Sequence, residues 1–481
     1  MENMPGLSRT SYDAVVVGAG PNGLAAAIRL AQENLSVLLV EANDTIGGGA
    51  RSAELTLPGF VHDVCSSVHP LAVGSPYFRR LPLERFGLKW IEPEIPVAHP
   101  LDGHRAAALY RSVERTAAGL GVDARAYDRL MRPLAANWEI LAAEFLQPML
   151  HMPRHPIQFG RFGLRGLRSA SGLARRCFSD EPARALFAGL AAHSFLPLEQ
   201  VASAAFGLVL GMTGHAVGWP IPRGGSQRIS DALASLFKTL SGEIITGWRI
   251  EKVEELPKAR VVLLDLTPRQ LLHIFGDKLP PRYRRRLKRF KYGPGIFKMD
   301  FALDGPVPWA AEPCRRAGTV HVCGTLDEVA AAERAATYGA HPEKPFVLLS
   351  QPSIFDSTRA PQGKHTVWAY CHVPHGSSFD MAPRIEAQIE RFAPGFRERI
   401  LARHVESCAD LEKKNANLVG GSINGGANDL WHLLARPIAH PEPYRMPIPG
   451  YYICSSSTPP GGGVHGMCGY YAAETALGDL R

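Results

Sequence analysis

The stretch YDAVVVGAGPNGLAAAIRLAQENLSVLLVEA, residues 12–42, contains every part of a dinucleotide-binding β-α-β unit in order. Its run VVV predicts a short buried strand, and the glycines of a phosphate-binding turn follow directly, namely Gly18, Gly20 and Gly23. Such glycines provide a tight turn, a close approach of the backbone to a pyrophosphate, and room for a helix to pack on the strand. A second predicted strand, residues 36–40, ends at Glu41, where an acid accepts hydrogen bonds from an adenosine ribose.

The helix that begins at this turn presents its free N–H groups and its positive dipole end to the bound phosphates. Leu24, Ile28 and Leu30 have the spacing of one apolar helix face, which would pack on the sheet. We therefore expect the first group of cofactor contacts to be Gly18, Gly20, Pro21, Asn22, Gly23, Glu41 and Ala42.

A second glycine-rich segment, NDTIGGGARS (residues 43–52), follows the ribose acid and favours FAD over NAD. Glycines at this position, Gly48 and Gly49 among them, let the backbone wrap the cofactor phosphates again, a feature that flavoproteins share. The far end of the chain agrees with this. Residues 450–473 predict a short strand, a glycine-rich turn and the start of a helix.

Three motifs carry a resemblance to a known family. They are LPGFVHDVCSSVHPLAVGSP (57–76), PRGGSQRISDAL (222–233) and STPPGGGVHGMCGY (457–470). Over residues 12–477 the chain resembles the phytoene desaturase-like FAD-dependent oxidoreductases, within the superfamily that also contains the flavin amine oxidases. Within that family it is most similar to the branch of pyridine nucleotide-disulphide oxidoreductase domain-containing protein 2 and its bacterial relatives.

The resemblance implies a second group of cofactor contacts. In the family the last motif lies under the flavin, where a helix N-terminus stabilises negative charge at the pyrimidine end of the ring. The matching positions are Gly462, Gly463, Val464, His465 and Gly466. Residues 244–253 resemble the strand whose backbone contacts adenine, and they place Ile250 there.

Two departures from the family pattern concern the same cofactor site. The arginine that normally follows the double glycine is displaced, because Gly49 and Ala50 precede Arg51. The family also has a glycine-rich hairpin after the adenine strand, and this sequence lacks its glycines, since none occurs between Gly247 and Gly276. We expect a shortened hairpin and retained FAD binding.

The order of the motifs predicts an α/β fold in two domains, since 481 residues exceed what one hydrophobic core normally supports. The fold class is a discontinuous Rossmann-like FAD-binding domain combined with an α+β substrate domain. We assign residues 12–80, 220–295 and 445–480 to the first domain, and residues 81–219 and 296–444 to the second. Residues 120–215 read mainly as helices, and 296–373 as a half-buried antiparallel sheet that forms the floor of a substrate cavity.

Composition excludes several other classes. No run approaches the roughly 20 apolar residues of a transmembrane helix, and residues 1–13 lack the apolar core of a signal peptide, so we expect a cytoplasmic protein. The 8 cysteines have neither CxxC nor metal-ligand spacing, so we expect reduced thiols and no metal site. The net charge of +8 comes without a nucleic-acid-binding motif, so we expect no nucleic-acid partner.

Two basic clusters remain, RYRRRLKRFKYG (282–293) and RHPIQFGRFGLRGLRSASGLARR (154–176). The first reads as a solvated helix face. In the second, aromatic and aliphatic residues alternate with arginines, which is typical either of an ordinary solvated face or of an amphipathic helix in peripheral contact with an anionic membrane.

Catalytic residues are not defined by the sequence, because a flavin accepts the hydride itself and needs from the protein mainly orientation and exclusion of water. The candidates are Lys298, placed like a lysine that some flavin oxidases hold near the ring, and His465 within the flavin turn. We interpret His69 and His215 as structural histidines.

The functional hypothesis is an FAD-dependent oxidoreductase that binds its cofactor non-covalently and dehydrogenates or isomerises an apolar small-molecule substrate. Isoprenoid, carotenoid-like and acyl substrates all fit. The alternatives are a flavin amine oxidase, for which Tyr470 and Tyr471 could form an aromatic cage, and a flavin-containing regulatory scaffold without turnover. The electron acceptor and the oligomeric state stay open.

Overall fold

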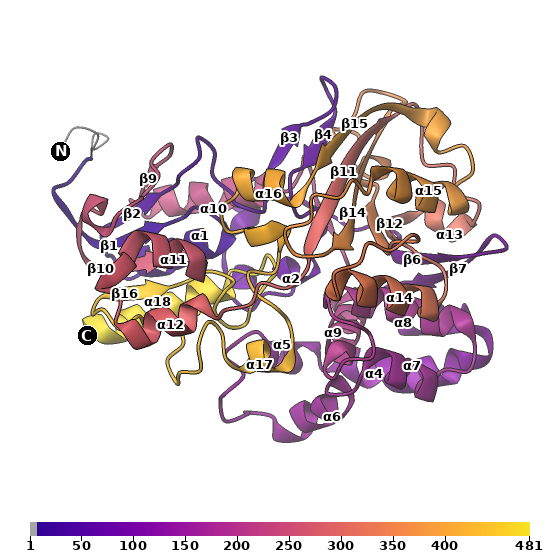
Figure 1. The fold of residues 1–481 in the computed structure, drawn as a ribbon, viewed down its shortest axis with the longest axis horizontal. Helices are drawn as coiled ribbons and strands as arrows, with labels where there is room; N and C mark the ends of the chain where they lie inside the picture. Colours follow the sequence, from indigo (N-terminus) through magenta and orange to yellow (C-terminus); the bar gives the residue numbers. More distant parts are fainter. Residues whose placement is uncertain (1–6) are drawn as a thin grey trace.

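The computed structural model describes residues 7–481; the first six residues of the N-terminal segment considered above lie outside it. Its strands form a five-stranded sheet, a seven-stranded sheet and two short two-stranded ribbons (Figure 1). The ribbons are β3 (Ser52–Glu54) with β4 (Val61–Asp63), and β5 (Trp90–Ile91) with β8 (Ile221–Pro222).

The five-stranded sheet is parallel throughout and collects strands from three distant parts of the chain. In spatial order these are β16 (Tyr451–Ile453), β10 (Lys258–Leu264), β1 (Ser11–Val17), β2 (Val37–Val40) and β9 (Glu243–Ile245). The order confirms the predicted Rossmann-like sheet, and its strands come from the three segments assigned to the cofactor domain. The exact domain limits stay a prediction.

Helices cover both faces of this sheet. Successive buried residues of its strands accordingly belong to two different apolar clusters, one on each face. Val16 and Leu39 pack with Leu24 on one face, while Val15 and Leu38 pack with Leu271 on the other. The first face carries α1 (Pro21–Ala31), α10 (Gln227–Thr239) and α18 (Met467–Leu480), and the second carries α11 (Pro268–Phe275) and α12 (Pro281–Lys288).

The seven-stranded sheet is antiparallel except where β6 runs parallel to β12. Its spatial order is β15 (Ile400–Glu406), β11 (Gly295–Leu303), β14 (His365–Val373), β13 (Val347–Ser350), β12 (Ala317–Val322), β6 (Ile95–Leu101) and β7 (Arg105–Leu109). The antiparallel sheet predicted for residues 296–373 is present as β11, β12, β13 and β14.

The prediction that this sheet is half buried is wrong, because every residue of β11 is buried. One face packs into a cluster that includes Met299, Phe301 and Val367, and Ile385 of α15 (Ala382–Phe392) belongs to that cluster. The opposite face, with Trp368 and Tyr370, belongs to the other large core. Alternation in these strands therefore separates two buried faces, not a buried face from solvent.

The predicted helical region, residues 120–215, is helical. It contains α4 (Ala124–Ala136), α5 (Trp138–Phe145), α6 (Pro156–Gly166), α7 (Ala170–Cys177), α8 (Glu181–Ala192) and α9 (Ser203–Ala216). These helices lie below the seven-stranded sheet in Figure 1, with α6 at the lower edge. The remaining helices are α2 (Pro70–Val73), α3 (Val113–Ala118), α13 (Glu312–Arg315), α14 (Leu326–Thr337), α16 (Cys408–Lys414) and α17 (Leu430–Leu434).

The connection from β9 to β10 confirms the shortened hairpin and corrects the adenine strand. β9 ends at Ile245, and the following residues up to Lys258 contain one short 3-10 turn, Val253–Glu255, and no strand. Ile250 therefore lies in an irregular segment beyond the strand. Within residues 7–481, no helix combines the length and the hydropathy needed to cross a membrane.

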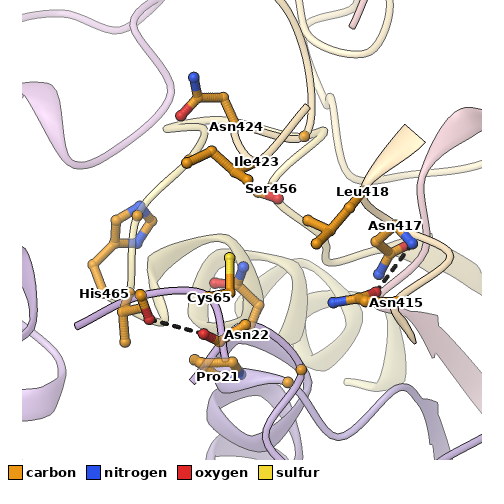
Figure 2. A pocket seen from close by; sticks show the side chains of 18 of the residues that line it. Pro21, Asn22, Cys65, Asn415, Asn417, Leu418, Ile423, Asn424, Ser456 and His465 are labelled. Atoms are coloured by element: carbon orange, nitrogen blue, oxygen red, sulfur yellow. Dashed lines mark hydrogen bonds between the residues drawn. The ribbon is translucent and has the colours of Figure 1, made fainter. Parts of the chain in front are cut away.

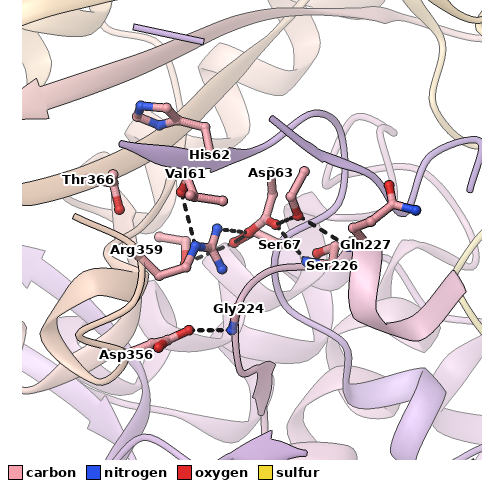
Figure 3. A network of polar contacts seen from close by, with 12 residues as sticks. Val61, His62, Asp63, Ser67, Gly224, Ser226, Gln227, Asp356, Arg359 and Thr366 are labelled. Carbon is pink, nitrogen blue, oxygen red and sulfur yellow. Dashed lines mark hydrogen bonds and ion pairs between the residues drawn. The ribbon is translucent and has the colours of Figure 1, made fainter. Parts of the chain in front are cut away.

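A buried ion pair joins the end of β4 to the loop before β14. The Arg359 guanidinium donates to the Asp63 carboxylate at 2.7 Å, and both side chains are fully buried. Arg359 also donates to the Val61 carbonyl, while Asp63 accepts from the Ser67 hydroxyl and the Ser226 backbone N–H (Figure 3). The pKa of Asp63 is lowered because the nearby guanidinium and these donors outweigh burial.

Candidate functional site

One cavity of about 540 Å³ extends from the glycine-rich turns of the Rossmann-like sheet into the substrate region. Thirteen of the residues expected to contact the cofactor line it: Gly18, Gly20, Pro21, Asn22, Glu41, Ala42, Gly48, Gly49, Ile250, Gly462, Gly463, Val464 and His465. The structure thus brings three distant segments of the chain to one wall. Figure 2 shows Pro21, Asn22, Cys65 and His465 in this wall.

The first glycine turn has the geometry that its sequence requires. Gly18 has a φ of 103°, which L side chains rarely adopt. A Cβ at Gly20 would lie 2.9 Å from the Asp265 carboxylate, and one at Gly23 would lie 1.8 Å from the Gly18 carbonyl oxygen. Gly23 therefore acts behind the wall, where it lets α1 approach β1.

Two carboxyl groups stand at the end of this turn. Glu41 accepts hydrogen bonds at 2.9 Å from the backbone N–H groups of Ala19 and Asn43, which fixes its carboxylate at the end of β2. Asp265, at the end of β10, accepts from the Gly23 N–H at 3.1 Å. Burial raises the pKa of Asp265 to about 7, with a further contribution from Glu41. No motif in the sequence indicated Asp265.

Arg51 does not reach the cavity wall as its family counterpart would. Its Nε donates to the Gly48 carbonyl at 3.0 Å, and its Nη2 donates to the Lys414 carbonyl at 3.3 Å. The inserted residues thus turn the guanidinium to support the second glycine turn from behind.

The C-terminal turn contains several glycines with left-handed backbone conformations. Gly461, Gly463 and Gly466 have φ values of 111°, 123° and 68°. Gly462 has no such angle; its constraint is steric, since a Cβ there would lie 3.0 Å from the Cα of Asn424. Gly466 packs under Phe78, behind the cavity wall.

His465 caps the helix that follows. Its Nδ1 accepts a hydrogen bond from the Met467 N–H at 3.0 Å, so the neutral ring carries its proton on Nε2. Burial lowers the pKa of His465 to about 4. The ring therefore contributes an uncharged N–H donor to the cavity wall at neutral pH.

Lys298 lies behind the wall in a buried charge cluster. It pairs with Asp300 and, at 3.6 Å, with Glu406, and all three side chains are buried. Burial raises the pKa of Asp300 to about 7. Cys65, which lines the cavity, is near enough for the Lys298 charge to act on its thiol, although burial raises the pKa of Cys65 to about 11.

A further segment, which no motif in the sequence marks, faces the first glycine turn across the cavity. Asn415, Asn417, Leu418 and Asn424 lie opposite Pro21 and Asn22 in Figure 2, and they line the same cavity. Asn417 Nδ2 donates to the Asp265 carbonyl at 2.7 Å, which ties the segment to the end of β10. Its position between two short helices gave no recognisable motif.

The substrate end of the cavity is mainly apolar and aromatic. Its wall residues from the helices and the second sheet are Phe145, Leu146, Met149, Phe162, His193, Phe195, Ala205, Phe206, Val209, Leu210, Trp219, Thr319, Leu348, Trp368 and Tyr370. The tyrosines proposed for an amine-oxidase cage lie elsewhere: Tyr470 packs on Tyr77 at 4.6 Å, and Tyr471 stacks on Tyr444.

The two histidines interpreted as structural differ in position. His215 bonds the Tyr127 hydroxyl at 2.8 Å and the Arg111 carbonyl at 3.3 Å, away from the cavity. His69 bonds the Ser226 hydroxyl at 2.8 Å but also lines the cavity. No group of side chains within residues 7–481 has a geometry suited to a metal ion, and the cysteines are unpaired.

The residues of the first half of the cavity fit a flavin adenine dinucleotide. The steric evidence is that glycine turns from both ends of the chain lie in one wall of the cavity, where added Cβ atoms would collide with neighbouring atoms. A carboxylate at Glu41 and the N-terminus of α1 stand where ribose and phosphate would be held. Fold and site together define a two-lobed dinucleotide-binding protein.

Comparisons with known proteins agree with this class. Residues 16–81 match the NAD(P)-binding Rossmann-like domain. Pyridine nucleotide-disulfide oxidoreductase domain-containing protein 2 of Rattus norvegicus is 27% identical over 99% of this chain and 95% of its own length. Phytoene dehydrogenase of Streptomyces griseus is 25% identical over 85% of this chain and 80% of its own. A putrescine oxidase variant shares the fold, with a TM-score of 0.63 at 17% identity over 98% of this chain and 99% of that structure.

These similarities support the resemblance of the motifs to the phytoene desaturase-like FAD-dependent oxidoreductases. The chain is an enzyme of the FAD-dependent oxidoreductase type, related to phytoene desaturases, and it shares its fold with a putrescine oxidase.

Proposed function

We propose that this protein binds FAD non-covalently and dehydrogenates or isomerises an apolar substrate, isoprenoid, carotenoid-like or acyl. The observation that carries the proposal is the single cavity, which continues from Glu41 and the glycine turns past His465 to the apolar wall around Phe162 and Leu210. A cofactor held along the first part would present its ring to a substrate held along the second.

The proposal of non-covalent binding rests on the side chains near the flavin turn. His465 Nδ1 is engaged by the Met467 N–H, and the Cys468 Sγ lies 3.4 Å from the Gly461 carbonyl oxygen in the core. Burial raises the pKa of Cys468 to about 12, so its thiol stays protonated and weakly nucleophilic.

When bound, a flavin supplies the hydride acceptor. The chain's own contribution is orientation, exclusion of water and uncharged hydrogen bonds. The aromatic and aliphatic side chains of the substrate end offer water few partners, and the Nε2–H of His465 offers one neutral donor beside the flavin turn. At neutral pH neither His465 nor His69 is charged, since burial lowers the pKa of each to about 4.

An amine oxidase is the second candidate, because a tryptophan and a tyrosine do line the cavity together. Trp368 and Tyr370 stand edge to face on β14, with ring centroids 5.1 Å apart. Such a pair offers an aromatic surface to a neutral amine. The third alternative is a flavin-containing scaffold without turnover.

Anaerobic mixing of the purified protein with polyenes, amines and acyl thioesters distinguishes these candidates. Loss of the oxidised flavin absorbance with a polyene or an acyl thioester supports the proposed function. Bleaching by amines alone supports the amine oxidase, and absence of bleaching with any of the three classes supports the scaffold.

The proposal includes peripheral contact between α6 and an anionic membrane. Ile157, Leu164 and Leu167 are 65%, 76% and 53% exposed, although each is a large apolar residue. Phe162 of the same helix turns inward and lines the cavity. The neighbouring exposed arginines Arg154, Arg161 and Arg168 form no ion pair with a described residue. Exposed apolar side chains surrounded by unpaired arginines suit the surface of an anionic membrane. Contact at α6 would open the cavity toward a substrate dissolved in that membrane.

Flotation with vesicles tests this contact. We expect binding to vesicles that contain phosphatidylglycerol and little binding to pure phosphatidylcholine. Leu164→Asp should abolish the binding, whereas Val122→Asp, at an equally exposed apolar residue (79% exposed) outside α6, should leave it unchanged. Equal binding by both variants would contradict the proposed contact.

A further inference from the structure

A cluster of histidines that the hydride chemistry does not use borders the substrate end of the cavity, where His193 is its lining member. His193, at the end of α8, lines the cavity, and its Nε2 lies 3.1 Å from Nε2 of His321 on β12. Behind them, His99 of β6 donates from Nε2 to the Gly324 carbonyl at 2.6 Å. Burial lowers the pKa of His193 to about 3 and that of His99 to about 4, so the cluster is uncharged at neutral pH.

The hydrogen bonds, taken together with the ring nitrogens that lack a partner, indicate which nitrogen of each ring carries the proton. Nδ1 of His321 and Nδ1 of His99 both face the Cα of Gly189, where an added Cβ would lie only 2.6 and 2.7 Å from them. These two Nδ1 atoms have no hydrogen-bond partner within the described chain and are best accommodated without a proton. His321 then donates through Nε2 to Nε2 of His193, which leaves His193 with an Nδ1–H.

The floor of the same region adds further polar groups without protein partners. Tyr370 of β14 lines the cavity, and no residue in 7–481 forms a hydrogen bond with its hydroxyl. The Thr319 Oγ1 and the Trp368 Nε1 are buried and unpartnered in the described structure, and both residues line the cavity. Buried polar groups are rarely left unpaired, so these atoms indicate a ligand that supplies partners.

The charged side chains of the cavity lie at its opposite end. Glu41, Arg249, Glu251 and Asp265 come from the ends of β2 and β10 and from the connection before β10. Near the histidines, Glu333 is occupied by His372, whose Nδ1 lies 2.7 and 2.8 Å from its two oxygens, and the Phe195 ring covers His372 at 3.8 Å. Lys298, which is the cross-strand partner of Tyr370, is likewise held by Asp300 and Glu406. A carboxylate or an ammonium group would therefore be buried here without a free counter-charge, which is costly.

We propose that the substrate of this enzyme carries an uncharged oxygen group, a carbonyl or a hydroxyl, and that the Nδ1–H of His193 and the hydroxyl of Tyr370 bind it. This inference rests on the proposed function and narrows its substrate class to oxygenated isoprenoid or acyl compounds. A pure hydrocarbon would leave the polar floor unpaired.

The probes are octan-2-one, octane, octanoate and octylammonium, titrated into the purified holoprotein at neutral pH. Quenching of tryptophan fluorescence reports binding, because Trp219 and Trp368 line the cavity. We expect octan-2-one to bind at least about tenfold more tightly than octane and the two ions, as expected for two neutral hydrogen bonds in a dry site. Octane, octanoate or octylammonium binding as tightly as octan-2-one would overturn the proposal.

Tyr370→Phe and His193→Phe test the residues. Each removes one hydrogen-bond donor and keeps an aromatic ring, and each should reduce the preference for octan-2-one over octane to less than about threefold. Tyr127→Phe is the matched control, since its hydroxyl bonds His215 outside the cavity wall. It should keep the preference. A preference unchanged in Tyr370→Phe, which removes a single oxygen atom, would overturn the proposal even if His193→Phe failed to fold.

FAD content is measured on the same samples. Protein without bound flavin would refute the proposed function, whereas the ratio of ketone to alkane affinity would still decide the present inference. The two failures are thus distinguishable.

Discussion

Gly23→Ala is the sharpest local test of the cofactor lobe, because a single methyl group would meet the backbone of the phosphate turn. An ideal Cβ at Gly23 would lie 1.8 Å from the Gly18 carbonyl oxygen, where real Cβ contacts essentially never fall below 3.0 Å. Helix α1 would therefore have to move away from β1 by about 1.2 Å, which would also displace the turn. We expect overpacking to lower the free energy of unfolding by ~3 kcal/mol.

The matched control is Gly163→Ala, in the interior of α6. A Cβ there meets nothing within 4 Å, so the same chemical change should raise the free energy of unfolding, by ~0.5 to 1 kcal/mol through helix propensity. Urea unfolding of both variants and FAD retention after gel filtration measure the outcome. Gly23→Ala with wild-type stability and full FAD content would refute the close packing of α1 on the turn.

The remaining predictions concern the ribose acid, the buried ion pair and pH. Glu41→Ala should weaken the affinity for FAD about tenfold or more, through loss of a charge-assisted hydrogen bond. The affinity for FMN should not change, because FMN lacks the adenosine ribose. Equal losses of both affinities in fluorescence titrations would place the ribose elsewhere. Arg359→Met should lower the free energy of unfolding by ~3 kcal/mol in urea, because it leaves Asp63 buried and unpaired, and Asp63→Asn added to it should recover part of the loss. Apoprotein stability should fall by ~2 kcal/mol or more from pH 7 to 5; a higher melting temperature at pH 5 than at pH 7 would contradict this.

The sign of the pH effect follows from the buried histidines. Burial lowers the pKa of six of them to about 3 or 4, so that below the unfolded value of 6.5 only the unfolded chain takes up their protons. Their contribution to stability is complete above that value and is lost as the pH falls. Asp265 and Asp300, with pKa values raised to about 7, act in the opposite direction between pH 4 and 7, but they are outnumbered.

The nucleotide half of the site could be predicted from sequence because its constraints are local. Gly18 needs a left-handed backbone angle, and Gly23 needs an absent side chain within one turn of the same helix. Such requirements leave a fixed spacing of glycines. Gly462 is different, because its constraint is a contact with Asn424, a residue 38 positions away, and not a local backbone angle.

The substrate half could not be predicted, because its contacts join residues that are far apart in the sequence. His193 ends a helix and His321 lies on a strand far along the chain, yet their ring nitrogens are 3.1 Å apart. Neither residue has a neighbour in sequence that marks it, and only the packing of α8 against the second sheet brings them together. The prediction of a half-buried sheet failed at β11 for a related reason. Alternating side chains along a strand indicate two different faces of the sheet, but they do not indicate what covers each face.

The central claim is that the cavity holds FAD, and the direct measurement is the cofactor content of the purified protein. We predict a yellow protein with the absorption spectrum of an oxidised flavin and close to one FAD per chain. Acid or heat denaturation should release all of the flavin from the polypeptide. A colourless protein that binds NAD but takes up no FAD on reconstitution would contradict the assignment, and flavin that stays attached after denaturation would contradict non-covalent binding.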